Sequence, residues 1–388
     1  MDFQLDEEFR LLNETVNKFV ENELMPLEAL VLEREALGGN HELTDAELAP
    51  LHDKCRELGL WGLDCPAETG GADLPAIALV GVNEALGRTI TPFTFPPDSP
   101  NLHMLLATAN DQQKEKYLEP YARGETISAI AISEPGAGAD PAGMSTRAVR
   151  EGDDWVLNGR KIWISRMDKA DFTIVMAVTD PEKGSRGGIS AFLVDRDTPG
   201  LDIARKILLI GGHYNYEIAF DNCRLPASQL LGVEGQGFAP MQLRLIVRRL
   251  EMGAWCLGAA RRALDMLCDY ANQRETFGER LADRQSIQWW VAELETRCHC
   301  LQLMLWHAAT KQDAGGDVRT EASMIKLYGT ELATDAIDWA MQTYGAMGMT
   351  KELPLHLMAQ RVRLMRIYEG PSEIHRWVLA RQRLKQNA

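Results

Sequence analysis

The spacing of apolar residues changes character twice along this chain, near Thr126 and again near Gly235. Before the first point and after the second, apolar residues recur every three or four positions, which indicates amphipathic helices. Between them, short β-rich runs are separated by Gly, Pro, Asn and Asp, which indicates strands. We therefore expect an α+β protein with a helical domain at 1–124, a β domain at 125–233 and a second helical domain at 234–388.

The β-rich region predicts a small antiparallel barrel or sandwich. Five runs are expected to be strands, namely 126–132, 155–165, 172–178, 189–194 and 216–220. No strand–helix–strand alternation accompanies them, so a doubly wound dinucleotide fold is not expected. The helical patterns after Gly235 exceed the average helix length of about 11–12 residues, which favours a bundle of long helices.

The composition excludes several classes of protein. The net charge of −15 argues against nucleic acid and anionic membranes as partners, because both repel an acidic surface. No apolar run approaches the ~20 residues needed to cross a bilayer. The N-terminus is acidic, unlike a targeting segment, and the seven Cys have no disulfide-framework spacing. We expect a cytoplasmic protein with free thiols.

The segment from Ile367 to Arg376 reads IYEGPSEIHR and places Glu369 beside Gly370 after a long helical region. A carboxylate held on such a turn, out of bulk water, is a candidate general base for removing a proton from carbon. An exposed Glu-Gly turn is also an ordinary surface feature. The assignment therefore depends on what else the chain provides.

Two further segments fit a planar, electron-rich ligand. The run from Ala131 to Pro141 leaves a strand and enters a Gly-rich turn, where backbone N–H groups and Ser133 can face a ligand edge. Trp163 and Ser165 share one face of the next predicted strand. A plain hairpin connection and a core Trp are the alternatives.

A fourth segment, Arg274 to Gly278, reads RETFG, and Gln285 follows it. An Arg fork close to a helix end suits a pyrophosphate group. A solvated surface Arg is the alternative. Cys298, His299 and Cys300 do not predict a metal site, because consecutive helical side chains point about 100° apart.

Together these segments resemble the acyl-CoA dehydrogenase family of flavoproteins over essentially the whole chain. The resemblance implies a helical domain, a small β domain and a four-helix bundle, in that order. The matching motifs are SEPGAG at 133–138, KIWIS at 161–165, RETFG at 274–278 with Gln285, QTYGAMG at 342–348 and YEG at 368–370.

The resemblance implies an enzyme that oxidises an acyl-CoA thioester with FAD. Glu369 would take the α-proton while flavin N5 accepts hydride from the β-carbon, and the Glu369 N–H would polarise the thioester carbonyl. Substrate contacts would come from Ala139, Arg249 and Gly370. The FAD contacts implied are Ile132, Ser133, Trp163, Ser165, Arg274, Thr276, Phe277, Gln285, Gln342, Gly345, Ala346, Pro371 and Glu373.

The family also implies partners and a substrate pocket. FAD is typically bound across a subunit boundary, so a homo-oligomer, a dimer or a tetramer, is expected, with an electron-transfer flavoprotein as electron acceptor. The acyl pocket is expected between the loop 93–100 and the long helix at 246–250. Bound acyl chain should raise the pKa of the base by desolvation.

Departures from the family pattern also carry information. Ala139 replaces a common Ser, Ala346 a common Gly, and Pro371 and His375 a usual Thr and Gln. Some relatives place the base on the long helix at about Arg248. An Arg cannot serve as the base there, which favours Glu369.

The chain also resembles a subgroup of the family that includes the dehydrogenase domains of kinase-like fusion proteins, some of which act on 4-hydroxyacyl-CoA. The motifs that carry this resemblance are GPSEIH at 370–375, GHYNYEI at 212–218 and PDSPN at 97–101.

Other activities occur on the same fold. An acyl-CoA oxidase, a nitroalkane oxidase and a flavin monooxygenase are alternatives, although the monooxygenase branch does not need the base Glu369. A non-enzymatic acyl-CoA-binding protein is expected to lose the base or the flavin arginine, and both Glu369 and Arg274 are present.

Overall fold

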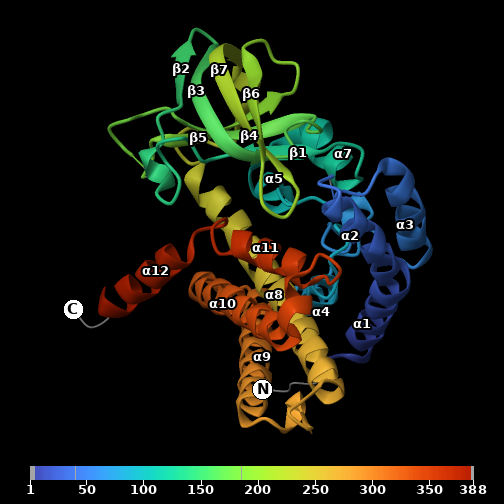
Figure 1. Cartoon of the computed structure of the whole chain (residues 1–388). Helices are drawn as coiled ribbons and strands as arrows, with labels where there is room; N and C mark the ends of the chain where they lie inside the picture. The colour runs from blue at the N-terminus through green and yellow to red at the C-terminus, as the bar shows by residue number, and fades with distance from the viewer. Residues whose placement is uncertain (1–4, 40, 185, 386–388) are drawn as a thin grey trace.

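The computed structural model describes residues 5–39, 41–184 and 186–385. The acidic N-terminal run begins with residues 1–4, which lie outside this part of the chain. Figure 1 shows a β domain at the top, the N-terminal helices along one side of the molecule and a bundle of long helices below. This three-part α+β arrangement confirms the predicted fold class.

The N-terminal region is built from short helices, and its Pro-rich segment at 91–100 is irregular, as predicted. One helix shows clearly why it starts where it does. The Thr44 side chain and Glu47 form a capping box, which satisfies free N–H groups at the helix start. The helices are α1 (Glu7–Phe19), α2 (Glu28–Ala36), α3 (Asp45–Glu57), α4 (Ala76–Gly87), α5 (Leu102–Thr108), α6 (Asp111–Gln113) and α7 (Glu119–Ala122).

The middle region forms an eight-stranded sheet in the order β6-β7-β3-β2-β4-β5-β8, with β1 paired to β4. Most neighbours are antiparallel, but β1 and β2 each pair with β4 in parallel, so the domain is not purely antiparallel. Alternate residues of the strands meet in an apolar core that includes Trp155 and Phe192. The strands are β1 (Ser128–Ala131), β2 (Arg147–Glu151), β3 (Asp154–Ser165), β4 (Phe172–Val178), β5 (Ile189–Asp195), β6 (Leu201–Leu208), β7 (Tyr214–Pro226) and β8 (Leu230–Leu231).

The C-terminal region is organised by one very long helix, α8 (Phe238–Gln273), which runs from the β domain into the bundle (Figure 1). The apolar face predicted on this helix is buried, including Leu250 and Leu267. A short β-hairpin separates α8 from the next helix. The remaining elements are β9 (Glu275–Thr276), β10 (Glu279–Arg280), α9 (Gln285–Asp313), α10 (Arg319–Tyr344), α11 (Leu355–Met365) and α12 (Ser372–Lys385).

Two glycines let α4 and α8 cross at very close range. A Cβ on Gly258 would lie 1.9 Å from the Glu84 carbonyl oxygen, and one on Gly87 would lie 2.0 Å from that of Trp255. Real side chains cannot occupy these positions without moving a backbone. The close crossing fixes α4 beside the part of α8 that forms the candidate site.

Candidate active site

The turn between α11 and α12 presents Glu369 in a conformation that few residues adopt. Its φ is +55°, and Gly370 follows with a φ of +94°. A Cβ on Gly370 would lie 3.2 Å from His375 Nε2 and 3.4 Å from Arg249 Nη2, so glycine also suits the crowding here. A strained, non-glycine residue on a crowded turn is typical of a functional position.

Three cations from two long helices hold this turn. Arg249 Nε donates to the Glu369 carbonyl oxygen at 3.0 Å, and Lys326 Nζ donates to that of Gly370 at 2.5 Å. Arg244 Nη1 donates to both carboxylate oxygens of Glu369, at 3.0 and 3.1 Å. The backbone of the turn is thereby fixed by α8 and α10, and its carboxylate is held by a third side chain.

The charge state of Glu369 is set by competition between burial and these cations. Burial raises the pKa of Glu369, but the positive charges of Arg244, Arg248 and Arg249 outweigh it and lower the pKa below its ordinary value. The carboxylate is therefore ionised in the unliganded protein. The rise in the pKa of Glu369 that the sequence analysis expects concerns the complex with an acyl chain. In the free protein the arginines lower this pKa.

A hollow lies between α4, the Pro-rich loop and α8. Its wall includes Thr94, Phe95 and the run from Pro97 to Pro100 from the loop, and Val247 and Arg248 from α8. This is where the sequence predicted the acyl pocket. The sequence did not predict the share of α4, which contributes Leu79, Val82, Asn83 and Leu86.

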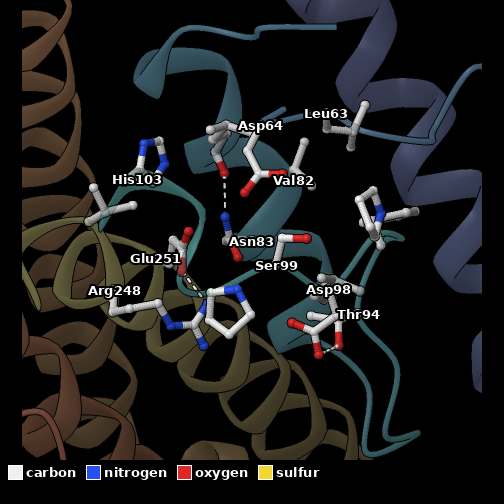
Figure 2. A pocket seen from close by; sticks show the side chains of 16 residues that line it. Leu63, Asp64, Val82, Asn83, Thr94, Asp98, Ser99, His103, Arg248 and Glu251 are labelled. Carbon is white, nitrogen blue, oxygen red and sulfur yellow. Dashed lines mark hydrogen bonds and ion pairs between the residues drawn. The ribbon is translucent and has the colours of Figure 1, made fainter. Parts of the chain in front are cut away.

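About half of the residues that line the hollow are polar or charged. Figure 2 shows Arg248 beside Glu251 on α8, with Asp64, Asn83 and His103 on the surrounding segments. Arg248 Nη1 forms an ion pair with Glu251. Burial, and then the charge of Glu251, raises the pKa of Asp64 to about 6, while burial lowers the pKa of His103.

The residues predicted to face a flavin ring come together at one end of the β domain. Ile162 N–H donates to the Ser133 carbonyl at 2.9 Å, which places the Gly-rich turn against β3. Trp163 is 51% exposed at a φ of +65°, and Ser165 is also exposed, with Ile164 buried between them. An aromatic face beside small hydroxyl groups can stack against a planar ligand and hydrogen-bond its edge, so this surface suits such a ligand.

Glu134, in the same turn, has a structural role. Its carboxylate accepts hydrogen bonds from Ser145 N and Oγ, from Thr146 N at 2.9 Å and from Lys161 Nζ at 2.9 Å. Burial raises the pKa of Glu134, but these hydrogen bonds and the charge of Lys161 lower it to about 2. The same Lys161 amine donates to the Ile132 carbonyl at 2.9 Å, which fixes the turn.

The second group of predicted FAD residues lies at the other end of α8. Tyr270 and Tyr344 stack with ring centroids 4.2 Å apart, which joins the ends of α8 and α10. Phe277 is fully exposed at a φ of +55° in the turn between β9 and β10. Gathered at this end are Arg274, Thr276, Phe277, Gln285, Gln342, Gly345 and Ala346.

The other predicted contact residues are distributed near the base or in the Gly-rich turn. Pro371 and Glu373 follow Glu369 directly, at the start of α12, and Ala139 is exposed in the turn after β1. The structure therefore assembles Glu369, Arg249 and Gly370 in one place. It separates the two groups of predicted FAD residues to opposite ends of α8.

Sequence reasoning missed Arg244 and Lys326, which contact the turn at Glu369 and Gly370, and Asn101, which holds Arg244. Arg244 and Lys326 are buried, and each contacts the base turn. The sequence feature that could have revealed Arg244 is its i,i+4 spacing from Arg248. This spacing puts two guanidinium groups on one face of a helix that is otherwise largely apolar. Charged residues are almost never fully buried without a partner.

Comparison with known proteins identifies the family of the chain. Family models for the N-terminal, middle and C-terminal domains of acyl-CoA dehydrogenase match residues 6–125, 129–223 and 235–384. The chain belongs to the acyl-CoA dehydrogenase family. Members of this family are FAD-dependent flavoproteins and oxidoreductases that act on the CH–CH bond of acyl-CoA.

Relatives cover the whole chain. It is 41% identical to the (R)-benzylsuccinyl-CoA dehydrogenase of Thauera aromatica, over 99% of this chain and 97% of that protein. It superimposes on butyryl-CoA dehydrogenase from Megasphaera elsdenii with a TM-score of 0.87 and 29% identity, covering 99% and 100% of the two chains. A chain in a structure of the electron transferring flavoprotein of Acidaminococcus fermentans gives a TM-score of 0.86 at 31% identity, covering 99% and 100%.

The described helices also bear on membrane association. None of them is both long and apolar enough to cross a bilayer.

The residues at the two ends of α8 fit FAD in chemistry. At one end lie an exposed aromatic ring and small hydroxyl donors, and at the other end lies an Arg. An isoalloxazine ring needs the first set and a pyrophosphate the second.

Proposed function

We propose that this chain dehydrogenates an acyl-CoA thioester to the trans-2-enoyl-CoA, with FAD as cofactor and Glu369 as the general base. The observation that carries the proposal is the largely buried carboxylate of Glu369, which is ion-paired with Arg244 and held on a strained turn. A base for a carbon acid must be fixed close to the substrate and shielded from water.

Different residues of this chain have different roles in the proposed reaction. The Glu369 carboxylate takes the α-proton, while Arg249 and Lys326 hold the turn so that the carboxylate keeps its position. The Glu369 N–H polarises the thioester carbonyl. Ser133, Trp163 and Ser165 bind the flavin ring, and bound FAD supplies the acceptor for the hydride that leaves the β-carbon.

We further propose that each FAD site is built from two copies of the chain. From Arg249 to Arg274 the rise along α8 is about 38 Å, at about 1.5 Å per residue. The separation supports the expectation of a homo-oligomer, because Arg274, Phe277 and Gln285 are too far along the helix to complete the site of their own chain. Whether the assembly is a dimer or a tetramer stays a prediction.

The electron acceptor and the compartment complete the proposal. We propose an electron-transfer flavoprotein as acceptor, supported by the relative found in a structure of such a protein. All seven cysteines are free thiols, which supports the cytoplasm. An acyl-CoA oxidase is the alternative, and the resemblance to the kinase-like fusion subgroup stays a prediction.

The proposal is tested by anaerobic bleaching of the flavin absorbance band with a panel of thioesters. The panel contains straight, branched and 4-hydroxylated acyl-CoAs, and benzylsuccinyl-CoA because the Thauera relative is named for it. We expect rapid bleaching by one class, slow re-oxidation in oxygen and fast re-oxidation by electron-transfer flavoprotein. Fast re-oxidation by oxygen would instead identify an oxidase, and a protein that no thioester bleaches would contradict dehydrogenation.

The base is tested by Glu369→Gln, which keeps the size of the side chain. Loss of a general base costs about 10²–10⁴-fold in rate, so turnover should fall at least a hundredfold while FAD content and acyl-CoA affinity are retained. Glu352→Gln, at an exposed acid before α11 that belongs to none of the predicted sites, is the matched control. Retained activity in Glu369→Gln would refute the assignment of the base.

A further inference from the structure

Arg244 is the one contact of the base that the proposed reaction does not use. Its side chain is 8% exposed and that of Glu369 is 14% exposed, so the pair is largely removed from water. Among the described residues, the Glu369 carboxylate accepts hydrogen bonds from Arg244 only. Arg244 thus binds the two carboxylate oxygens of Glu369, and one of these oxygens must accept the proton from the substrate.

Arg244 is held in place independently of the base. Its Nε donates to Asn101 Oδ1 at 2.8 Å, and Asn101 Nδ2 donates to Ser128 Oγ at 2.8 Å. The Asn101 N–H donates to the Tyr121 hydroxyl oxygen at 3.2 Å. This anchor would keep the guanidinium where it is after Glu369 turns toward a substrate.

A buried guanidinium that loses its only anion is costly. Removing one partner of a buried ion pair is strongly destabilising, because the other charge stays buried without compensation. A purely hydrocarbon acyl group offers nothing to Arg244 when Glu369 leaves it. An acyl group with its own anionic substituent would replace Glu369 at Arg244 and release the base.

Arg244 and its anchor Asn101 are each near, along the chain, to residues that line the hollow. Arg248, one helical turn further along α8, and Pro100, which precedes the anchoring Asn101, both line the hollow. The hollow is also lined by Asp64, His103 and Glu251, which an all-hydrocarbon acyl group would not require (Figure 2). The site is therefore suited to an acyl group with polar functionality.

The geometry also limits where the substituent sits. A base abstracts a proton from about 2.6–3.2 Å, and Arg244 Nη1 lies 3.0 Å from the nearer Glu369 oxygen. The guanidinium is then within about 6 Å of the substrate α-carbon. A carboxylate that hydrogen-bonds the guanidinium at about 2.8 Å therefore suits a short tether, and we take one or two carbons between it and the α-carbon.

We propose that Arg244 is a binding site for a carboxylate on the acyl group, so that the substrate is a coenzyme A monothioester of a dicarboxylic acid whose free carboxylate lies one or two carbons from the α-carbon. This inference rests on the proposed function. Arg244 acts as a binding residue, and the reaction at the α- and β-carbons is unchanged: Glu369 takes the proton and FAD takes the hydride.

The first experiment compares thioesters that differ only in charge. Succinyl-, glutaryl- and benzylsuccinyl-CoA are each paired with their methyl esters, and kcat/KM is measured by flavin reduction. A hydrogen bond to a charged group is worth about 1.5–3 kcal/mol, so at least one acid should exceed its ester by about tenfold or more. Esters that react as fast as the acids would overturn the inference and leave the dehydrogenase function standing.

The second experiment isolates Arg244. Arg244→Gln should remove the preference for the acid over its ester, whereas Arg376→Gln, an arginine at the surface, should keep it. Dissociation constants measured on Glu369→Gln give a readout without turnover, and there the acid should bind at least about tenfold more tightly than its ester. Equal affinities in that variant would also overturn the inference, and no bleaching by any thioester would contradict the proposed function itself.

Discussion

The β domain and the helical bundle each bury one carboxylate against a cation, and the two pairs are built differently. Glu134 meets Lys161 with exposures of 3% and 0%, and its oxygens also accept hydrogen bonds from Ser145 and Thr146. Glu369 and Arg244 are less deeply buried, at 14% and 8%, and among the described residues no backbone N–H donates to the Glu369 carboxylate. A fully satisfied buried charge is suited to holding structure, whereas a partly satisfied one is available for exchange.

The hollow adds a third carboxylate to the comparison. Asp64 is partly buried near the Arg248–Glu251 pair, where burial and the repulsion of Glu251 raise its pKa to about 6. The pKa of Glu134 is about 2 and that of Glu369 is lowered by arginines. The number of cations and donors around each carboxylate thus decides its charge, more than its depth does.

The largest effect is expected from breaking the structural pair. Lys161→Met leaves Glu134 buried without its cation and removes the hydrogen bond to the Ile132 carbonyl. Loss of one partner of a buried pair costs about 3–5 kcal/mol, so unfolding in urea should shift to a clearly lower midpoint. A loss below 1 kcal/mol would mean that Ser145 and Thr146 alone satisfy Glu134.

The next effect concerns the pH dependence of the base. Arg244→Gln removes a cation next to Glu369, and an opposite charge at this range lowers a carboxyl pKa by about 1–3 units. The pKa of Glu369 in the free enzyme should rise accordingly. Because activity requires the ionised base, the acid limb of kcat/KM should move to higher pH by about 1–3 units. An unmoved limb would show that Arg248 and Arg249 set the pKa.

A smaller effect is expected at Asp64. Its pKa is higher in the folded protein than the ordinary 3.8, so the folded state binds the proton more tightly and stability falls as pH rises from about 4 to about 6. Asp64→Asn should remove this fall and stabilise the protein at pH 8 by about 3 kcal/mol, with little difference at pH 4. Asp153→Asn, in the exposed turn between β2 and β3, is the control for thermal unfolding at both pH values.

The smallest effect is expected for an exposed pair that shares the chemistry of the buried ones. Arg376 Nη2 lies 2.7 Å from Glu331 Oε2, with side-chain exposures of 52% and 26%. Exposed pairs contribute about 0–1 kcal/mol and are screened by salt. Arg376→Gln should therefore lower stability by less than about 1 kcal/mol. A loss as large as that of Lys161→Met would remove the distinction between buried and exposed pairs.

The sequence predicted the fold wherever one face of an element is buried. The runs at 155–165 and 172–178 became β3 and β4 because their alternating or continuous apolar residues pack in the core. It missed β2 and the edge strand β6, whose side chains are almost all at least partly exposed. Without a buried face, neither strand has a periodic apolar pattern.

The sequence predicted the base turn but not what holds it. Glu369 and Gly370 are adjacent, so a local motif reveals them. Arg244 and Lys326 lie 125 and 44 residues from their partners in the turn, and a single Arg or Lys on a helix reads as a solvated charge. Their roles depend on how α8 and α10 pack, which local patterns do not encode. The contacts to FAD stay predictions.

Asn101 belongs to the N-terminal region, Ser128 to the first strand and Arg244 to the long helix, so one amide side chain ties together all three regions of the chain. A partly folded molecule in which the β domain has separated from the bundle would keep its helices and lose this junction. Circular dichroism would report a nearly native helix content for that molecule, whereas a catalytic assay would find it inactive. Recovery of activity is therefore the stricter measure of correct folding in this protein, because it reports the final docking step rather than the formation of helices.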